Sequence, residues 1–465
     1  MEKAVLFGAS KLGEIAYSNL KDKFDIVAFI DNDKKKQDTK FCGLDVFNPQ
    51  ILKDNNYMVI ISSMFFLEIM EQLINYGIRK FAVFNMDNDS EVRFFDYSHI
   101  DNFSTRPNKI ALIMENNSGS NTRALLKKAS NEIISKYELV ALEQNNKNED
   151  YFFHLLTSEM LIYTHDALYK ENKIKVQLWH GFPLKGLSYM SNYLTKEEKN
   201  KNHREWEKLD VIASYSQTYS TLMNASYGLD GNKYCITGMP RNDFLFDADG
   251  REALSEVLNI DLNNKKVILY MPTFRKTVSG QENGQDDMFN ILDIHGFDEE
   301  LFNMYLEENN IVFLIKYHPV HVYKDKKGKN MHILKDESFR DKNLDLYEII
   351  NAADLLITDY SSIYFDYLLL DRPIVFTPLD LEAYIENRGF LLEPYDFWTP
   401  GPKCYNFNQL TEEITRCLND NSYFKKERET ICNIVHHYKD ANSSDRVWKV
   451  IDELITKKND LKNFS

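Results

Sequence analysis

Polar and charged side chains follow several short apolar runs between residues 175 and 380, and these residue types suit phosphate chemistry. They are His180; Arg241 and Asp243; Thr273 and Arg275; Lys316 and His318; and Asp359, Ser361 and Ser362, which follow five separate runs. Arginine and lysine bind phosphate oxygens, and a histidine near neutral pKa can accept the proton of an attacking hydroxyl. Together these residue types predict a site for a negatively charged substrate.

The segment DLLITDYSSIYFD, residues 354–366, has the pattern of a buried strand, a tight turn and a helix. Ser361 or Ser362 stands where the N-cap of that helix is expected. A helix start exposes N–H donors and carries partial positive charge, so it can hold a phosphate without a metal or a lysine. An ordinary capped helix has the same pattern, but the polar residues at the other strand ends favour an anion site.

Short β-rich runs alternate with helical segments along most of the chain, which predicts an α/β fold with parallel sheets covered by helices. In such sheets, ligands bind outside the carboxyl ends of the strands. The polar residues at the predicted strand ends should therefore converge. Prolines that fix a turn follow four of these ends: Pro183, Pro240, Pro272 and Pro319.

Residues 1–90 predict a separate, small Rossmann-like α/β domain. A strand, a turn containing Gly8, Ser10 and Gly13, and a helix precede a second strand that ends at Asp31. This is the order of a nucleotide-binding βαβ unit, so these four residues are a candidate nucleotide site. Because Ser10 replaces the middle glycine, a packing or regulatory role is the favoured interpretation. The charged and aromatic residues 91–108 predict a linker.

The composition excludes several classes of protein. The net charge of −15 argues against a generic nucleic-acid binder, which needs Lys and Arg to neutralise phosphates. Five scattered cysteines without a CxxC pair are typical of a reducing cytosol. The sequence shows neither a signal peptide nor an apolar stretch near the roughly 18 residues of a membrane span. We expect a cytoplasmic protein, with peripheral membrane association left open. Without HExxH or a Cys/His cluster, we expect no metal site.

The chain from about residue 175 to 405 resembles the CDP-glycerol glycerophosphotransferase family, the teichoic-acid primases and polymerases of bacterial cell envelopes. The matching motifs, in the family's order, are WHGFPLKG (179–186), GMPRND (238–243), ILYMPTFR (268–275), KYHP (316–319), LLITDYSSIYFDY (355–367), RPIVF (372–376), DLEAYIENRGF (380–390) and PGP (400–402). Residues 109–175 fit more loosely. Phe182 stands where the family usually has threonine, which bears on acceptor or alditol selectivity. Residues 1–90 are not a standard family part and resemble modules of capsule enzymes, so a capsule role stands beside a wall teichoic acid role.

The resemblance implies a GT-B architecture, with two Rossmann-like domains facing across a cleft. Residues 109–245 would form the acceptor-side domain, and residues 246–465 the CDP-donor-binding domain with C-terminal helices. The implied reaction moves glycerol phosphate or ribitol phosphate from CDP-glycerol or CDP-ribitol to a polymer hydroxyl and releases CMP, with no cofactor assigned. His180 would be the general base, and His318 would contact the donor pyrophosphate. The other donor-side residues would be Arg241, Asp243, Thr273, Arg275, Lys316, Asp359, Ser361, Ser362 and Asp366.

The acceptor and the exact activity stay open at this point. The implied acceptor is a lipid-linked or polymeric polyol or saccharide, and residues 187–206 are a candidate patch for the inner membrane surface. One alternative is a GT-B glycosyltransferase that uses a nucleotide sugar. Another is a non-catalytic nucleotide-binding scaffold, against which the presence of both His180 and His318 argues.

Overall fold

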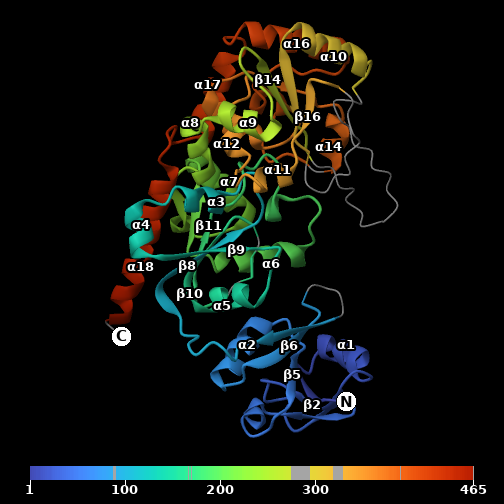
Figure 1. Cartoon of the computed structure of the whole chain (residues 1–465), viewed down its shortest axis with the longest axis vertical. Coiled ribbons are helices and arrows are strands. Elements are labelled where there is room, and N and C mark those ends of the chain that lie inside the picture. The colour runs from blue at the N-terminus through green and yellow to red at the C-terminus, as the bar shows by residue number, and fades with distance from the viewer. Residues whose placement is uncertain are drawn as a thin grey trace. The chain divides into compact units, whose positions relative to one another are not determined.

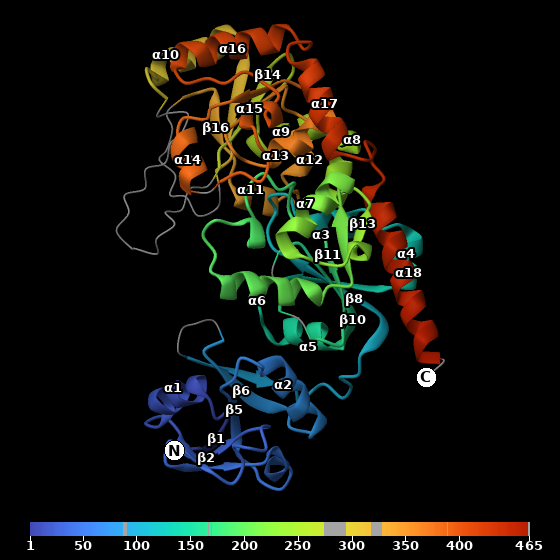
Figure 2. The same ribbon diagram turned by 180° about the vertical axis from the view of Figure 1, so that it is seen from behind.

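The structure is a computed structural model that describes residues 1–86, 91–165, 167–168, 170–273, 294–317, 328–387 and 389–463. Its internal contacts divide the chain into two units. The first comprises Met1–Ala111, Val140–Leu161 and Ala167–Lys173, and the second comprises Leu112–Leu139, Ile162–Asp166 and Ile174–Ser465. Figure 1 shows the elements along the chain, and Figure 2 shows them from behind.

A seven-stranded sheet in the first unit has the order β3-β4-β2-β1-β5-β6-β7. Its strands are β1 (Lys3–Phe7), β2 (Asp25–Ile30), β3 (Lys40–Phe41), β4 (Leu44–Phe47), β5 (Met58–Ile61), β6 (Lys80–Phe84) and β7 (Val92–Asp96). The five inner strands pair in parallel, and β3 and β7 pair antiparallel at the two edges. Helices α1 (Lys11–Leu20) and α2 (Phe66–Asn75) follow β1 and β5. The buried side chains of α2 recur at helical spacing, as an amphipathic helix on a sheet requires.

Strand β7 corrects the predicted extent of this domain, because it lies within the predicted linker 91–108. It pairs with β6 over residues 92–96, and β8 then begins at Arg106. Phe95 is the only buried residue of β7, while Arg93 and Phe94 are exposed. An edge strand that buries one side chain lacks the alternation from which strands are predicted.

A six-stranded sheet has the order β13-β12-β11-β10-β8-β9. Its strands are β8 (Arg106–Met114), β9 (Glu138–Glu143), β10 (Ser158–Tyr163), β11 (Ile174–Gln177), β12 (Val211–Ser214) and β13 (Tyr234–Ile236). The helices between them are α3 (Asn121–Lys127), α4 (Asn131–Lys136), α5 (Glu149–Thr157), α6 (Lys196–Glu207) and α7 (Gln217–Tyr227). The polar stretch before residue 208 contains helix α6, which begins with a capping box of Thr195 and Glu198.

A five-stranded, wholly parallel sheet has the order β16-β15-β14-β17-β18. Its strands are β14 (Lys266–Met271), β15 (Ile311–Ile315), β16 (Met331–Ile333), β17 (Leu355–Thr358) and β18 (Ile374–Phe376). All residues of β15, β17 and β18 are buried. Uninterrupted apolar strands of this kind are typical of parallel sheets covered by helices on both faces.

The helices after β13 are α8 (Phe244–Asp247), α9 (Gly250–Leu258), α10 (Glu299–Glu308), α11 (Asp336–Arg340), α12 (Tyr347–Ile350), α13 (Ile363–Tyr367), α14 (Leu381–Asn387), α15 (Tyr395–Trp398), α16 (Phe407–Asn419), α17 (Lys425–Val435) and α18 (Ser443–Asn463). Helices α10 and α16 lie side by side in both views, where Phe302 packs edge-on against Phe407 at 5.9 Å between ring centroids.

Helix α18 packs outside the domain to which the sequence assigns it. The indole Nε1 of Trp448 donates a hydrogen bond to the Leu125 carbonyl of α3 at 3.1 Å, and Lys136 forms an ion pair with Asp452. Helix α18, the last helix of the predicted domain 246–465, therefore packs against residues of the predicted acceptor-side domain.

Candidate active site

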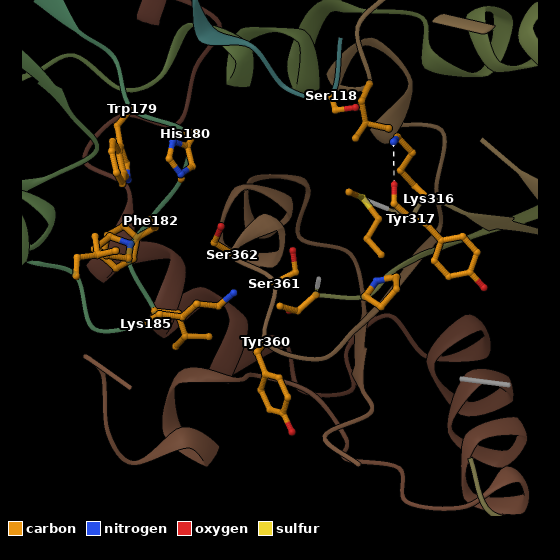
Figure 3. Close-up of a pocket in the computed structure, with 18 residues that line it drawn as sticks. Ser118, Trp179, His180, Phe182, Lys185, Lys316, Tyr317, Tyr360, Ser361 and Ser362 are labelled. Carbon is orange, nitrogen blue, oxygen red and sulfur yellow. Dashed lines mark hydrogen bonds between the residues drawn. The ribbon is translucent and has the colours of Figure 1, made fainter. Parts of the chain in front are cut away.

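A cavity of about 420 Å³ in the second unit brings together many of the predicted site residues (Figure 3). The residues that follow strands of the six-stranded sheet, which we call the first wall, are Trp179, His180, Gly181, Phe182, Pro183, Leu184, Lys185, Leu187 and Ser118. Of these, Ser118 lies beside Lys316 in Figure 3. The opposite side, the second wall, follows strands of the five-stranded sheet and consists of Met271, Pro272, Thr273, Lys316, Tyr317, Leu346, Tyr360, Ser361 and Ser362.

The order of the strands explains why these residues meet. Strands β15, β14 and β17 are direct neighbours, so the residues that follow them lie side by side at one edge of the sheet. Thr273 follows β14, Lys316 follows β15, and Ser361 follows β17. The predicted convergence of these three strand ends is confirmed. It lies at the carboxyl ends of the strands, where ligands usually bind in a parallel sheet.

His180 lies on the first wall with its imidazole open to the cavity. Its Nδ1 lies 3.2 Å from the carbonyl oxygen of Thr164. A carbonyl can only accept a hydrogen bond, so Nδ1 must carry the proton, which leaves the lone pair on Nε2. His180 is therefore held in the tautomer that can accept a proton at Nε2.

Two aromatic rings fix the plane of the His180 imidazole. His165 stacks on it with a centroid distance of 4.3 Å and an interplanar angle of 2°, and Trp179 lies 4.1 Å away. The surrounding protein lowers the pKa of His180 below that of a free imidazole, chiefly by desolvating the charged form, and His165 adds to this effect. Burial likewise lowers the pKa of His165, to about 4. Both rings are neutral at pH 7, as a general base requires.

We expect substitutions of His165 to change the pH dependence of the reaction. In His165→Phe the stacked ring remains but its electrostatic effect is lost, so the pKa of His180 should rise and the acidic limb of the kcat/KM profile should move to higher pH. In His165→Ala the stack is lost, and kcat should fall by about tenfold or more because the base is less well positioned. Arg241 and Lys185 also lower this pKa and remain in both variants. Wild-type profiles in both variants would exclude this role.

Asp359 organises the second wall. Its Oδ1 accepts hydrogen bonds from the backbone N–H groups of Thr273, at 2.8 Å, and Tyr360, at 2.5 Å. The Thr273 hydroxyl, by contrast, is buried with no hydrogen-bond partner among the described residues. Asp359 thus fixes the turn and the strand end beside it, and Thr273 offers an unused hydroxyl at the cavity.

Lys316 brings a positive charge to the second wall, although its ammonium group has local partners. Its Nζ lies 2.9 Å from Asp336 Oδ1 and donates to the Tyr317 carbonyl at 3.0 Å. Asp336 also accepts a hydrogen bond from the Ser118 hydroxyl of the first wall at 2.7 Å. The charge of Lys316 is therefore held in place by a carboxylate that joins the two walls.

Ser361 and Ser362 line the cavity, and Ser362 stands at the N-cap position, as predicted. Helix α13 begins at Ile363, and the Ser362 side chain makes no capping hydrogen bond to it. The helix is only five residues long before it tightens into a 3₁₀ turn, so the groups that this segment offers to an anion are the two serine hydroxyls. Gly181 approaches Ser362 so closely that a Cβ would lie 2.7 Å from its hydroxyl oxygen.

Arg241 and Asp366 do not line the cavity, contrary to their predicted contact with the donor. They form a buried ion pair, 2.6 Å from Nη2 to Oδ2, beneath the cavity. Arg241 also donates to the Gly119 carbonyl at 3.0 Å, and Asp366 accepts from Tyr347 at 2.6 Å and Asn242 at 2.9 Å. Both Nη atoms of the guanidinium bind protein groups, so the pair joins the segment after β13 to helix α13.

Asp243 also has a structural position instead of the predicted donor contact. Its two carboxylate oxygens each accept a backbone N–H at 2.8 Å, from Ser443 and from Ser444. These are the first residues of α18, and Asp243 is fully buried. A carboxylate at a helix start satisfies otherwise unpaired donors and complements the helix dipole, so Asp243 anchors α18.

Asp243→Ala is expected to lower the free energy of unfolding by about 1–2 kcal/mol and to leave the KM for the donor unchanged, because only the cap of α18 is removed. Denaturant unfolding and initial-rate kinetics measure the two effects. Asp243→Asn retains an oxygen acceptor and should lose less stability. A raised KM for the donor without a loss of stability would show that Asp243 contacts the donor.

Several predicted residues lie elsewhere. His318 and Arg275 fall outside the described residues. Gly8, Ser10 and Asp31 line a different cavity, in the first unit, and Gly13 packs beside Gly8.

Sequence reasoning did not select His165, Ser118, Lys185, Tyr317 or Tyr360 as site residues. His165 and Ser118 follow strands β10 and β8, so the same rule of polar residues after strands would have found them. Lys185 and Tyr360 stand inside the quoted motifs, next to selected residues.

Phe182, which replaces the family's usual threonine, is buried. Its ring contacts Phe365 at 4.7 Å and Tyr215 at 5.8 Å between centroids. Most of this side chain packs against aromatic rings, which leaves little of it to contact a substrate.

The described residues contain no group of three or more His, Cys, Asp or Glu side chains placed to bind a metal ion. No helix within those ranges combines the length and the apolar character needed to cross a membrane.

Comparison with known proteins places this site in a family. Residues 78–453 match the family CDP-glycerol:poly(glycerophosphate) glycerophosphotransferase, and residues 1–84 match the family C2185-like, N-terminal. The teichoic acid poly(ribitol-phosphate) polymerase of Bacillus spizizenii is 31% identical over 62% of this chain and 44% of its own length. The teichoic acid glycerol-phosphate primase of Bacillus subtilis is 29% identical over 65% of this chain and 74% of its own.

A variant of the wall teichoic acid polymerase TagF has a similar fold, with a TM-score of 0.63 and 21% identity over 78% of this chain and 93% of that one. This likeness confirms the predicted GT-B-like architecture. The family match covers more than half of the residues. The chain therefore belongs to the CDP-glycerol:poly(glycerophosphate) glycerophosphotransferase family, whose members are transferases of alditol phosphates.

Proposed function

We propose that this chain transfers glycerol phosphate or ribitol phosphate from a CDP-alditol to a hydroxyl of a cell-envelope polymer, a teichoic acid or a capsule, and releases CMP. The observation that carries the proposal is the pairing of a neutral His180 on one wall with hydroxyls and a lysine on the other (Figure 3). A base that faces a phosphate-binding surface across one cavity suits the transfer of a phosphoryl group to a hydroxyl.

The relatives support the type of donor and of acceptor. They are named as polymerases and primases of poly(ribitol phosphate) and poly(glycerol phosphate), and a structure of TagF was determined with CDPG. The matched polymerase of Bacillus spizizenii is longer than this chain, which spans 44% of it. We therefore assign the transfer chemistry to this chain and leave product length and the choice of alditol to experiment.

The proposed step is an in-line displacement at the β-phosphorus of the CDP-alditol. The acceptor oxygen forms the new bond to this phosphorus as the bond to the bridging oxygen breaks, and CMP leaves with that oxygen. The acceptor proton passes to Nε2 of His180, whose Nδ1–H stays on the Thr164 carbonyl. The products are CMP and the polymer extended by one alditol phosphate.

Groups of the second wall would stabilise the charge that develops on the pyrophosphate. The Thr273, Ser361 and Ser362 hydroxyls can donate hydrogen bonds to phosphate oxygens, and the fixed Lys316 ammonium adds a positive charge beside them. Hydroxyl donors placed in advance by Asp359 and by the strand ends need little rearrangement as the leaving group acquires charge.

The acceptor we propose is lipid-linked or polymeric, and the protein would meet it at the cytoplasmic face of the membrane. The first wall opens next to residues 187–190, where Met190 is 47% exposed. This stretch belongs to the predicted surface patch at residues 187–206.

Thr273→Val should raise the KM for the CDP-alditol about tenfold with a smaller change in kcat, because a hydroxyl without a protein partner is lost from the donor side. Steady-state kinetics at a saturating acceptor concentration measures the split. Thr358→Val is the matched control, since its hydroxyl donates to the Met271 carbonyl at 2.7 Å and lies outside the cavity wall. If Thr273→Val keeps the wild-type KM, this residue does not contact the donor.

A donor panel with a prenyl-phosphate-linked acceptor tests the proposed function. CDP-glycerol, CDP-ribitol, CMP-sugars and UDP-sugars are each supplied, and nucleotide release and acceptor mass are followed. We expect CMP release with one of the CDP-alditols and a gain of one alditol phosphate per transfer. Release of nucleotide from a nucleotide sugar, with an acceptor that gains one sugar, would instead show a glycosyltransferase. Tight binding of a nucleotide without turnover would show a non-catalytic scaffold.

A further inference from the structure

A second cavity, of about 530 Å³, lies in the first unit at the carboxyl ends of strands β1, β2 and β5. The lining residues come from the segments after these strands: Phe7, Gly8, Ser10, Asp31, Asn32, Asp33, Lys36, Ser63, Met64, Phe65, Glu68 and Ile69. β2 and β5 flank β1 on opposite sides, so the chain changes direction across the sheet at this point. In open α/β sheets, such a switch point is where ligands bind.

Gly8 in the turn after β1 and Gly13 in the first turn of α1 are packed so tightly that glycine is required at both positions. A Cβ at Gly8, whose φ is +128°, would lie 2.6 Å from the Ser62 carbonyl oxygen, and one at Gly13 would lie 2.0 Å from the Gly8 carbonyl oxygen. Side chains therefore cannot fill the space above this turn from these two positions. The cavity remains open at the start of α1.

Two ten-residue helices begin at this cavity without a side-chain cap. Ser10 precedes α1 and Phe65 precedes α2, and neither side chain makes a capping hydrogen bond. The first backbone N–H groups of each helix thus lack the usual protein acceptor at the side chain of the preceding residue. Phosphate oxygens can take that place, and the helix dipoles favour their charge.

Asp31, which follows β2, is fixed beside the turn after β1. Its Oδ2 accepts from the Ala9 N–H at 2.9 Å and the Lys36 ammonium at 3.0 Å, and its Oδ1 accepts from the Asp33 N–H at 2.9 Å. Each carboxylate oxygen has two lone pairs, so Oδ1 can still accept one further hydrogen bond, such as one from a ribose hydroxyl. Its place after the second strand is where an acid binds a ribose.

Apolar side chains complete the cavity. Phe65 is 70% exposed and Met64 is 86% exposed at its rim, and Phe7 and Ile69 lie on its wall. A flat base can stack on such a surface.

From this arrangement we propose that residues 1–84 bind a ribonucleoside diphosphate group, with the phosphates at the starts of α1 and α2, the ribose at Asp31 and the base against Phe65. A dinucleotide and a nucleotide-activated sugar or alditol both contain this group. The acids Asp31, Asp33 and Glu68 outnumber Lys36 in the lining, so the phosphates would be held by backbone donors and not by cationic side chains.

Calorimetric titration of the full chain with ADP, UDP, CDP, CDP-glycerol and NAD⁺ tests this site. All proteins carry Ser361→Glu, which places a carboxylate in the cavity of the second unit and removes phosphate binding there. We expect at least one probe to bind, and Ser10→Glu to weaken it tenfold or more by charge repulsion at the start of α1. The probe that binds most tightly identifies the source of the diphosphate.

Asn56→Glu is the matched control, because Asn56 is exposed and precedes β5 at its amino end, away from the cavity. It should bind as the parent does. Phe65→Ala, at an exposed position that folding does not require, should weaken every ribonucleotide and leave inorganic pyrophosphate unaffected. The proposal is overturned if no probe binds up to about 1 mM, or if Ser10→Glu and Asn56→Glu bind equally well. Neither result bears on CMP release by the wild-type second unit.

Discussion

His180→Ala is expected to lower kcat for CMP release by about 10²–10⁴-fold, the usual contribution of a general base. The variant removes the ring whose Nε2 faces the cavity while Nδ1 is held by the Thr164 carbonyl. The binding constant for the CDP-alditol should change much less, because the groups assigned to the phosphates lie on the opposite wall. Single-turnover kinetics and equilibrium binding measure the two quantities separately.

His203→Ala controls for the loss of a histidine as such. Its Nδ1 lies 2.7 Å from the Tyr227 carbonyl, in the same kind of hydrogen bond, but it stands on α6 away from the cavity lining. We expect its kcat to stay near the wild-type value. Near-normal CMP release by His180→Ala would assign the proton transfer to another group.

Arg241→Met is expected to lower the free energy of unfolding by about 3–5 kcal/mol, because it leaves the buried Asp366 carboxylate without its counter-charge. The double variant Arg241→Met, Asp366→Asn removes both charges and should recover much of this loss. Denaturant unfolding measures the effect. Lys208→Met is the control, because it breaks the ion pair with Glu205 between side chains that are 36% and 44% exposed. It should lower the free energy of unfolding by at most about 1 kcal/mol. A donor-binding Arg241 would instead change KM with little loss of stability.

The same pair predicts a dependence of stability on pH. Burial opposes the charge of Asp366, but Arg241, together with His436 and the hydrogen bonds from Tyr347 and Asn242, holds its pKa below the usual range. A carboxyl whose folded pKa is depressed contributes stability above its unfolded pKa, about 3.9, and loses it as the pH falls through the folded value. The stability gap between the wild type and the double variant should therefore shrink below about pH 4.

The sequence was sufficient for the sheets and for the place of the site. Fully buried parallel strands read as short apolar runs, and the polar residues that follow them converge because β15, β14 and β17 are neighbours. That rule located His180, Thr273, Lys316, Ser361 and Ser362 in one cavity. The edge strand β7 was missed because only one of its side chains is buried.

The sequence could not separate residues that contact the substrate from those that hold the walls. Arg241, Asp243 and Asp366 belong to motifs of the site and have the right chemistry for a phosphate or a proton. Their partners, however, are 125 residues away for Arg241 and 200 for Asp243, and no local pattern reveals such contacts. The stacking of His165 on His180 depends in the same way on two strands, β10 and β11, ending at the same level.

The bonds beneath the cavity limit how its walls can move. Arg241 reaches both Gly119 and Asp366, and the buried Asp345 accepts the backbone N–H groups of Gly119 and Ser120 at 3.2 Å. These contacts join the segments behind the two walls at the floor of the cavity. Sliding one wall past the other would require these buried hydrogen bonds to break together. The buried polar cluster should therefore keep His180 at a fixed distance from the residues of the second wall.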